Sequence, residues 1–337
     1  MSKNKDMANI TKKQRKQKNK RVKIVSDTDN TSSSVQTITP NNCIIDKIFS
    51  KQQLFRYINE YVSFMFLCDT CSYLSNLKKY IIYKLNRNHS LKYYNDVLFR
   101  NLVKSKIDRP SKQLYINLYC CVTITDVSFL GDVYSLNLSY CNTSDVSALG
   151  RVSILNLSYC SNIIDVSALG NVYNLILKNC KNIKNVSNLG KVHILDLSDN
   201  NNIDVSGLGN VHTLNLKSCK SITNVNALVN VKNLDLSFCD NITDISYLGN
   251  VHTLKLYCCN KITDVSALKN VNTLDLSFCN KITDVSALRN VYSLILRGCH
   301  GITDVSALSN IHTLDLRMCY KIKNIGILKN VCELTLP

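Results

Sequence analysis

The strongest constraint on the fold is an internal repeat of 20 residues that runs from Gln113 to Pro337. The typical unit reads Val-x-x-Leu-x-Leu-Ser-x-Cys-x-x-Ile-Thr-Asp-Val-Ser-Ala-Leu-x-Asn, and its positions are numbered 1 to 20 below. After Gln113, later units open at Val133, Val152, Val172, Val192, Val211, Val231, Val251, Val271, Val291, Ile311 and Val331. Two units have 19 residues, eleven units are complete, and the twelfth is a single predicted strand.

Each unit combines a short strand pattern with an apolar return segment. In the unit from Val271, Leu274 and Leu276 alternate with polar residues, which is typical of a half-buried strand. Apolar residues at positions 12, 15 and 18 then lead the chain back to the same core. Because one unit cannot bury its own apolar face, the units are expected to stack. The sequence thus predicts an α/β solenoid of parallel strands, with 3-10 or extended chain in the return segments.

The repeat resembles a known family. The pattern Leu-x-x-Leu-x-Leu-x-x-Asn/Cys-x-Leu is similar to the leucine-rich-repeat signature, here in a cysteine-containing type with short units. Valine replaces the first leucine and isoleucine the last, and the resemblance covers residues 113–337. The resemblance implies an arc with its strands on the concave face, where partners of this family usually bind. It therefore implies a non-enzymatic protein–protein interaction scaffold.

Two polar columns of the repeat are interpreted as structural. Position 9 is cysteine in every complete unit except one, which has Asn200. Asparagine shares size and hydrogen bonding with cysteine but not thiolate chemistry, so we predict a packing ladder rather than a redox or metal site. Position 14 is mostly aspartate, but Asn185, Asn224 and Asn324 also occupy it. Both residue types accept hydrogen bonds from backbone N–H groups, so capping is preferred over calcium binding.

Other candidate ligands are sparse. His193, His212, His252 and His312 share position 2 with several tyrosines, which favours a surface edge over a zinc site. The pair Cys68-x-x-Cys71 has no second pair and is assigned to packing. No phosphate loop, zinc-protease motif, dinucleotide fingerprint or nucleophile elbow occurs. No catalytic residue, cofactor or metal is therefore predicted.

The candidate binding surface is the outward side of the strands, taken as positions 3, 5, 7 and 8. Exposed aromatic rings next to charges are typical of protein-binding hot spots. The predicted partner-binding residues are Tyr140, Tyr159, Asp196, Asp235, Phe238, Lys255, Tyr257, Asp275, Phe278, Arg297, Asp315 and Arg317. The alternative is an ordinary solvated face whose rings pack on neighbouring turns.

Residues 1–40 are predicted to be a disordered basic tail, since nothing in them can form a core. Their basic cluster resembles a nuclear localisation signal and contains Lys12, Lys13, Arg15, Lys16, Lys18, Lys20 and Arg21. A solvated tail is the alternative interpretation.

Residues 41–112 show apolar residues near helical spacing and are predicted to be a helical N-terminal segment. Residues 44–82 resemble an F-box, with Ile44–Phe49 like its first helix and Phe66–Lys79 like its later part, although the usual Leu-Pro and Trp are missing. This resemblance implies a substrate adaptor that docks on a Skp1-like protein of a ubiquitin ligase. The alternative role is a cap over the apolar end of the solenoid, and the two roles are compatible.

The charge is unevenly distributed along the chain, whose net charge is +17. The repeat region holds 18 basic and 16 acidic residues and is nearly neutral, whereas residues 1–112 hold 23 basic and 8 acidic residues. Nucleic-acid binding is thus unlikely through the repeats and is kept as an alternative for the N-terminal region. The charged N-terminus, the 16 cysteines and the absence of a membrane-length apolar run favour an intracellular setting, cytoplasmic or nuclear, without a membrane.

Overall fold

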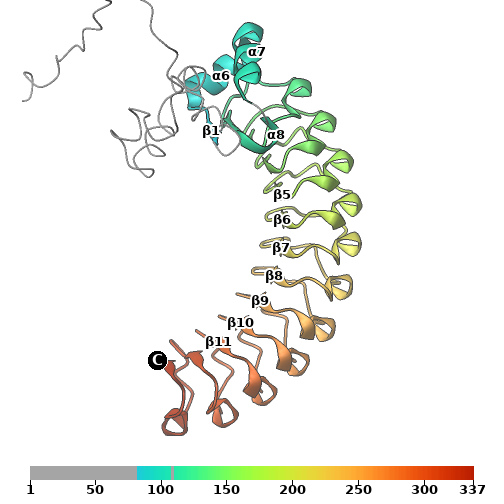
Figure 1. Ribbon diagram of the computed structural model, residues 1–337. Coiled ribbons are helices and arrows are strands. Elements are labelled where there is room, and N and C mark those ends of the chain that lie inside the picture. Colours follow the sequence, from blue (N-terminus) through green and yellow to red (C-terminus); the bar gives the residue numbers. More distant parts are fainter. Residues whose placement is uncertain (1–81, 108–109) are drawn as a thin grey trace, which may run out of the picture. The chain divides into compact units, whose positions relative to one another are not determined.

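The computed structural model describes residues 82–107 and 110–337. Within this part of the chain, every strand belongs to one parallel sheet, in which the 13 strands follow one another in sequence order. The predicted α/β solenoid is confirmed, and Figure 1 shows the successive coils following a curve with the 3-10 helices on its outer side. The strands are β1 (Tyr83–Lys84), β2 (Leu114–Asn117), β3 (Ser135–Asn137), β4 (Ile154–Asn156), β5 (Asn174–Ile176), β6 (Ile194–Asp196), β7 (Thr213–Asn215), β8 (Asn233–Asp235), β9 (Thr253–Lys255), β10 (Thr273–Asp275), β11 (Ser293–Ile295), β12 (Thr313–Asp315) and β13 (Glu333–Thr335).

The register of the sheet follows the repeat. Leu274 of β10 pairs with Leu254 of β9 and Leu294 of β11, so the leucines at position 4 form one column. The leucines at positions 4 and 6 are almost entirely buried from Leu136 to Leu316. Burial of these side chains, at about 1.5–3 kcal/mol each, is available only to stacked coils.

The return segments contain 3-10 helices, as the short period predicted. In η11, Leu288 N–H donates to the Val285 carbonyl across 3.0 Å, which is the i to i+3 bond of this helix. The 3-10 helices are η3 (Ser128–Leu130), η4 (Ser147–Arg151), η5 (Ser167–Asn171), η6 (Ser187–Lys191), η7 (Ser206–Leu208), η8 (Asn226–Leu228), η9 (Ser246–Asn250), η10 (Ser266–Asn270), η11 (Ser286–Asn290), η12 (Ser306–Leu308) and η13 (Ile325–Leu328).

The described part of the N-terminal segment holds α6 (Arg87–Asn95), α7 (Val97–Lys106) and α8 (Pro110–Gln113). These helices contact the first coil: the Asn117 N–H donates to the buried Ser90 hydroxyl at 3.1 Å, and the Arg100 guanidinium lies 3.6 Å from the centre of the Phe129 ring. Strand β1 also extends the sheet by pairing with β2, which the helical pattern did not predict.

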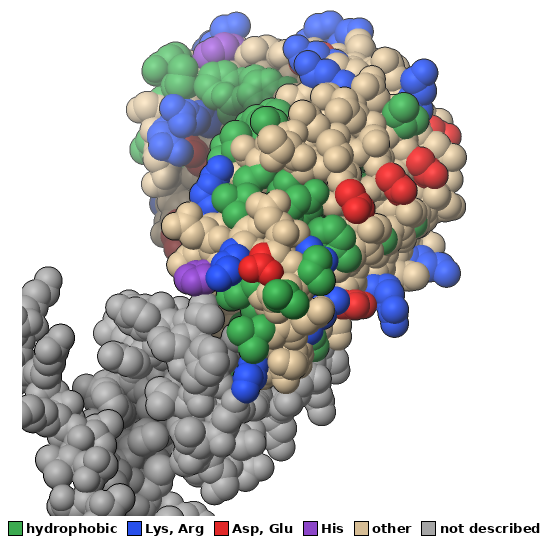
Figure 2. All heavy atoms as spheres, turned by 90° about the horizontal axis from the view of Figure 1, so that it is seen from above, with side chains coloured by type: hydrophobic (Ala, Val, Ile, Leu, Met, Phe, Trp, Pro, Cys, Tyr) green, Lys and Arg blue, Asp and Glu red, His purple; other side chains and the backbone are tan. Residues whose placement is uncertain are grey.

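The end that carries α6 and α7 is not entirely polar. Val97 and Leu98 on α7 are 57% and 81% exposed, and Figure 2 shows hydrophobic side chains at the surface of this end among Lys and Arg. No helix in the described part of the chain has both the length and the apolar character needed to cross a membrane.

Candidate functional site

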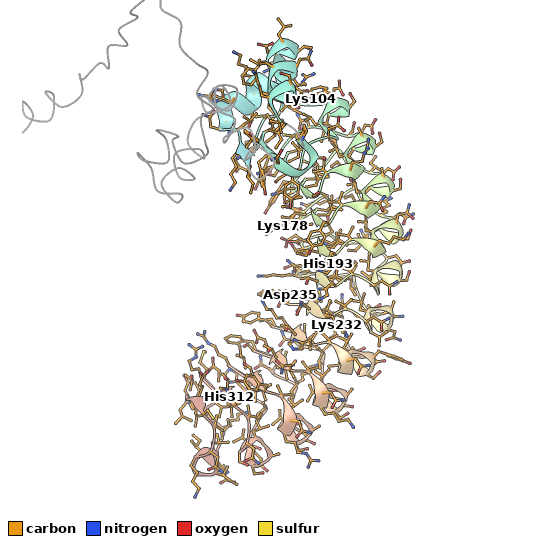
Figure 3. The ribbon with its side chains drawn as sticks, viewed as in Figure 1. Lys104, Lys178, His193, Lys232, Asp235 and His312 are labelled. Atoms are coloured by element: carbon orange, nitrogen blue, oxygen red, sulfur yellow. The ribbon has the colours of Figure 1, made fainter. Side chains whose placement is uncertain are left out.

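The strand face is defined here as the side chains at positions 3, 5, 7 and 8 of the units. Lys178 and Asp235, from positions 7 and 5, lie on the inner side of the curve in Figure 3. The predicted partner-binding residues therefore come from the strands and from the turn that follows each strand.

At position 5, asparagine and aspartate side chains hold the turn that follows the strand. The Oδ1 atom of Asp275 accepts from the Ser277 N–H at 2.9 Å and from the Ser277 hydroxyl at 2.5 Å. The same backbone bond occurs in the other units with an acidic or amide side chain at position 5, namely at Asn117, Asn137, Asn156, Asp196, Asn215, Asp235 and Asp315. These side chains thus have a structural role that strand alternation did not reveal.

The prediction that position 7 faces outward is wrong for its serines. Ser139, Ser158, Ser198, Ser237 and Ser277 are all buried. The chain bends after position 6, so that the position 7 N–H donates to the side chain at position 5 rather than continuing the strand. Only the longer residues at this position reach beyond the turn.

Position 8 has a left-handed backbone in every complete unit, with φ between 54° and 67°. Asn179, Asp199 and Gly298 suit this conformation, because short polar side chains and glycine tolerate it. Aromatic residues do not, yet Tyr140, Tyr159, Phe238 and Phe278 occupy it. The backbone is strained at these four positions, as it is at Cys120, Ser218, Cys258 and Met318, which share the conformation.

The rings form two clusters that cross from coil to coil. In the first, Tyr119 and Tyr140 have ring centroids 5.5 Å apart, and Tyr140 and Tyr159 are stacked at 4.4 Å. The second contains Phe238, Tyr257 and Phe278, with centroid distances of 5.0 Å and 5.3 Å. The interpretation that rings pack on neighbouring turns is therefore correct in part, although Tyr140 remains 39% exposed.

The Phe278 ring also covers the next coil. A Cβ atom at Gly298 would lie 2.6 Å from the Phe278 ring, so the glycine at this position makes room for it. The left-handed backbone at Gly298, with φ of 67°, favours glycine for a second reason.

Two of the predicted charged residues, Asp315 and Arg317, bind each other. Arg317 binds the Asp315 carboxylate through Nε and Nη2, with Nε 2.9 Å from Oδ1, and Asp315 is only 8% exposed. Burial acts to raise the pKa of Asp315, but the hydrogen bonds and the charge of Arg317 together outweigh it and hold the pKa below its usual range.

The other cations of the strand face differ in their partners. Lys178 pairs with Asp199 at 3.3 Å, and the Lys217 ammonium lies 5.3 Å from the centre of the Phe238 ring. Lys255 lies beside Asp235 and Asp275 in the sheet register, and no salt bridge joins these described residues. Three cations of this surface therefore form no salt bridge with a described carboxylate, namely Lys217, Lys255 and Arg297.

The cysteine column is a hydrogen-bonded packing ladder, as predicted. The Cys279 thiol donates to the Leu256 carbonyl of the preceding coil, with Sγ 3.0 Å from the oxygen, and equivalent bonds run from Cys141 to Cys319. Asn200 takes the same place and donates to the Leu177 carbonyl at 2.8 Å. Burial raises the pKa of the Cys279 thiol to about 12, so it is a poor nucleophile and metal ligand at neutral pH.

The aspartate column at position 14 forms turns that start the 3-10 helices, which confirms the capping prediction. Asp284 accepts from the Ser286 N–H at 2.8 Å, and Asn224 accepts from the Asn226 N–H at 2.9 Å. These backbone hydrogen bonds lower the pKa of the aspartates, as at Asp145 and Asp165.

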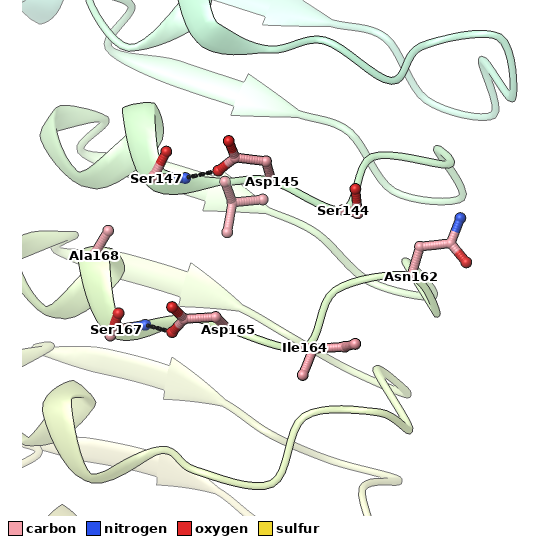
Figure 4. Close-up of a pocket in the computed structure, with 9 residues that line it drawn as sticks. Ser144, Asp145, Ser147, Asn162, Ile164, Asp165, Ser167 and Ala168 are labelled. Atoms are coloured by element: carbon pink, nitrogen blue, oxygen red, sulfur yellow. Dashed lines mark hydrogen bonds between the residues drawn. The ribbon is translucent and has the colours of Figure 1, made fainter.

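Figure 4 shows where two of these caps line a shallow depression of ≈ 310 Å³. Asp145 and Asp165 lie in it with their bonded Ser147 and Ser167, next to Ile164, which is 67% exposed. Among residues 82–107 and 110–337, no three His, Cys, Asp or Glu side chains are grouped so that they could hold a metal ion.

Three of the four histidines of position 2 stack on a histidine or a tyrosine of a neighbouring coil. His193 lies between Tyr173 and His212, with ring centroids 4.8 Å and 4.5 Å away, and Tyr292 stacks on His312 at 4.4 Å. Ring packing between coils explains why tyrosine and histidine share this column.

A larger cavity near α7 was not expected from the repeat pattern. It has a volume of ≈ 760 Å³, and Tyr115, Tyr134, Lys104 and Arg151 contribute to its lining. Tyr115 and Tyr134 contact each other at 5.3 Å, and Lys104 pairs with Asp132 at 3.6 Å. Helix α7, in the segment expected to cap the solenoid, therefore lines a cavity that the periodicity of the sequence could not predict.

Several sequence predictions lie outside the described residues. They are the tail of residues 1–40 with its basic cluster, the Cys68-x-x-Cys71 pair, and the F-box-like segment of residues 44–82 apart from Ile82.

Comparison with known proteins supports the identity of the repeats. A family model described as "Leucine Rich repeats (2 copies)" matches residues 249–290, and no curated protein matches the sequence. An internalin, InlF of Listeria monocytogenes, is similar at 26% identity with a TM-score of 0.52, over 63% of this chain and 70% of that chain. A functional domain of InlJ from the same species, which includes a cysteine ladder, has 19% identity and a TM-score of 0.47, over 65% of this chain and 50% of that chain. The repeats of this solenoid are leucine-rich repeats.

Proposed function

We propose that this chain is a non-enzymatic protein–protein interaction scaffold that binds its partner through the strand face. The observation that carries the proposal is the presence of aromatic rings on a left-handed backbone at position 8. A bulky residue in this conformation costs about 1–2 kcal/mol. Ring stacking stabilises the chain by about 0.5–1.5 kcal/mol per pair, which does little more than offset this backbone cost. The stability of the free chain therefore does not by itself explain the rings.

The location of the rings fits binding to another protein. Tyr140 and Tyr119 are 39% and 42% exposed, and Phe238 lies next to Lys217, a cation without a carboxylate partner among the described residues. Tyrosine and arginine dominate protein-binding hot spots, and Arg297 adds a second cation near Phe278, to whose N–H its carbonyl is bonded.

A catalytic role receives no support from the two columns with reactive side chains. The cysteines of position 9 are buried and hydrogen-bonded to backbone carbonyls, and the aspartates of position 14 accept from backbone N–H groups. Both columns are thus committed to holding the coils together. Leucine-rich repeats are typically interaction modules, which is consistent with this assignment.

Site-specific photo-crosslinking tests the proposal. The full chain would carry a photoreactive phenylalanine in place of Phe238 or Tyr257, and a matched control would carry it in place of the exposed Arg289 in η11. We expect the same partner protein to be crosslinked in cells from Phe238 and Tyr257 and not from Arg289. Crosslinking that is equal at all three positions, or confined to Arg289, would refute binding through the strand face.

A further inference from the structure

The strand faces of the first three complete coils differ from those of all later coils in charge. Residues 114–125, 133–144 and 152–164, which cover the strands β2 to β4 and the turns after them, contain no charged residue. From Lys178 onward, the strand face of each coil carries at least one Lys, Arg, Asp or, in the last strand, Glu. A neutral surface rich in tyrosine and asparagine is therefore set apart within a basic protein.

The asparagines of this surface offer donors but few acceptors. Asn117, Asn137 and Asn156 each accept, through Oδ1, the N–H two residues later, at 3.1 Å, 3.0 Å and 2.9 Å. In Asn137 and Asn156 the same oxygen also accepts a serine hydroxyl at 2.6 Å. These contacts fix the side-chain amides, whose Nδ2 groups donate to no other described residue. Each amide thus has N–H donors left for a bound molecule.

Tyrosine rings lie beside these amides at a defined spacing. Tyr119 and Tyr140 meet edge to face at 5.5 Å, and Tyr140 and Tyr159 stack at 4.4 Å with an interplanar angle of 9°. The outer rings, Tyr119 and Tyr159, are therefore at most about 10 Å apart. One three-residue turn of a polyproline II helix rises roughly 9 Å. The ring cluster therefore spans no more than about one turn of such a helix.

The geometry points to a proline-rich segment of a partner protein, in polyproline II conformation, as the ligand of this surface, which we call the Tyr/Asn patch (Asn117, Tyr119, Asn137, Tyr140, Asn156 and Tyr159). The inference rests on the proposed function and specifies one class of partner. Proline has a carbonyl acceptor and no N–H, and a polyproline II helix has no internal hydrogen bonds, so its carbonyls are free to accept from the amide Nδ2 groups. The proline rings of such a segment pack on aromatic side chains, which is the usual way in which proline-rich segments are recognised.

A neutral oligosaccharide fits this surface less well. Sugar hydroxyls donate hydrogen bonds as well as accept them, so a sugar-binding site would also need acceptors for those donors. Asn137 and Asn156 offer no free acceptor, because their Oδ1 atoms already accept from the backbone and hydroxyl groups of Ser139 and Ser158, so the acceptors would have to come mainly from the tyrosine hydroxyls.

Fluorescence anisotropy with the full chain tests the inference. The probes are fluorescein-labelled ten-residue peptides that repeat Pro-x-x-Pro with Pro, Leu or Arg at x, and the control probes are the same peptides with alanine for proline. At least one proline peptide should bind saturably, and Tyr140→Ala and Tyr159→Ala should each raise its Kd by about tenfold or more. Tyr247→Ala is the matched control, because Tyr247 is an exposed tyrosine of the return segment in η9 and not of the strand face, and it should leave the Kd unchanged.

Asn137→Asp separates binding from folding. Asp235 in a later coil accepts the Ser237 N–H at 2.9 Å, so an aspartate at position 137 keeps the turn while replacing the Nδ2 donor with an acceptor. We expect an unchanged melting temperature and a Kd several-fold higher. Absence of saturable binding by every proline peptide, binding that survives the double change of Tyr140 and Tyr159 to alanine, or preferential competition by maltoheptaose would overturn the inference. Crosslinking from Phe238 and Tyr257 would leave the proposed function standing in each of these cases.

Discussion

Replacing Asp275 with alanine tests whether position 5 holds the turn after the strand. The Asp275 carboxylate accepts from the Ser277 N–H at 2.9 Å and from its hydroxyl at 2.5 Å, and Ser277 is buried. Without that acceptor, two donors remain in a place that water barely reaches, and each unsatisfied buried donor costs about 1–3 kcal/mol. Because the turn can relax, we expect Asp275→Ala to lower the free energy of unfolding by about 1–2 kcal/mol in total.

Two other variants should lower the free energy of unfolding by less and by more than Asp275→Ala. Asp275→Asn keeps Oδ1, which accepts the same two bonds in Asn137 and Asn156, so its effect should stay within about 0.5 kcal/mol. Leu276→Ala empties a fully buried site and should cost about 2–5 kcal/mol.

The assay combines urea unfolding with hydrogen exchange at the Ser277 amide, because stacked repeats unfold locally as well as globally. Asp275→Ala should speed exchange at Ser277, and Asp275→Asn should not. If Asp275→Ala matched Asp275→Asn in both stability and exchange, the side chain at position 5 would have no structural role and would be free for binding.

Two further results are expected. Hydrogen bonds from backbone N–H groups lower the folded-state pKa of Asp264 and Asp284 below the ordinary 3.8, so their stabilisation is present above pH 3.8 and is lost as the pH falls through the lower folded pKa. Changing both to Asn should flatten the acid-induced drop in melting temperature, and an unaltered pH profile would contradict this origin. Iodoacetamide labelling of the native chain, mapped by mass spectrometry, should modify the exposed Cys120 and Cys332 and spare Cys279, whose pKa burial raises to about 12. Equal labelling rates before unfolding would show that the ladder opens.

The sequence alone determined the architecture, because the repeat imposes the same local pattern on every unit. Leucines at positions 4 and 6 can be buried only by stacking, and a 20-residue period leaves space for no more than a short helix in the return. It also determined the roles of the cysteine and aspartate columns, since Asn200 and Asn224 exclude chemistry that only a thiolate or a carboxylate could perform. The bonds from Cys279 and Asp284 confirm both roles.

Only the tertiary structure decided which strand-face side chains are free to bind. Alternation predicts that positions 5 and 7 point outward alike, but the chain bends after position 6 and buries the serine at position 7. At this bend, N–H groups of position 8 bond to a coil about 20 residues away, as Phe278 N–H does to the Arg297 carbonyl at 2.8 Å, and position 8 takes a left-handed backbone. Local periodicity contains no information on these distant acceptors. In the folded chain Asp275 holds a turn, whereas Tyr140 keeps an exposed ring.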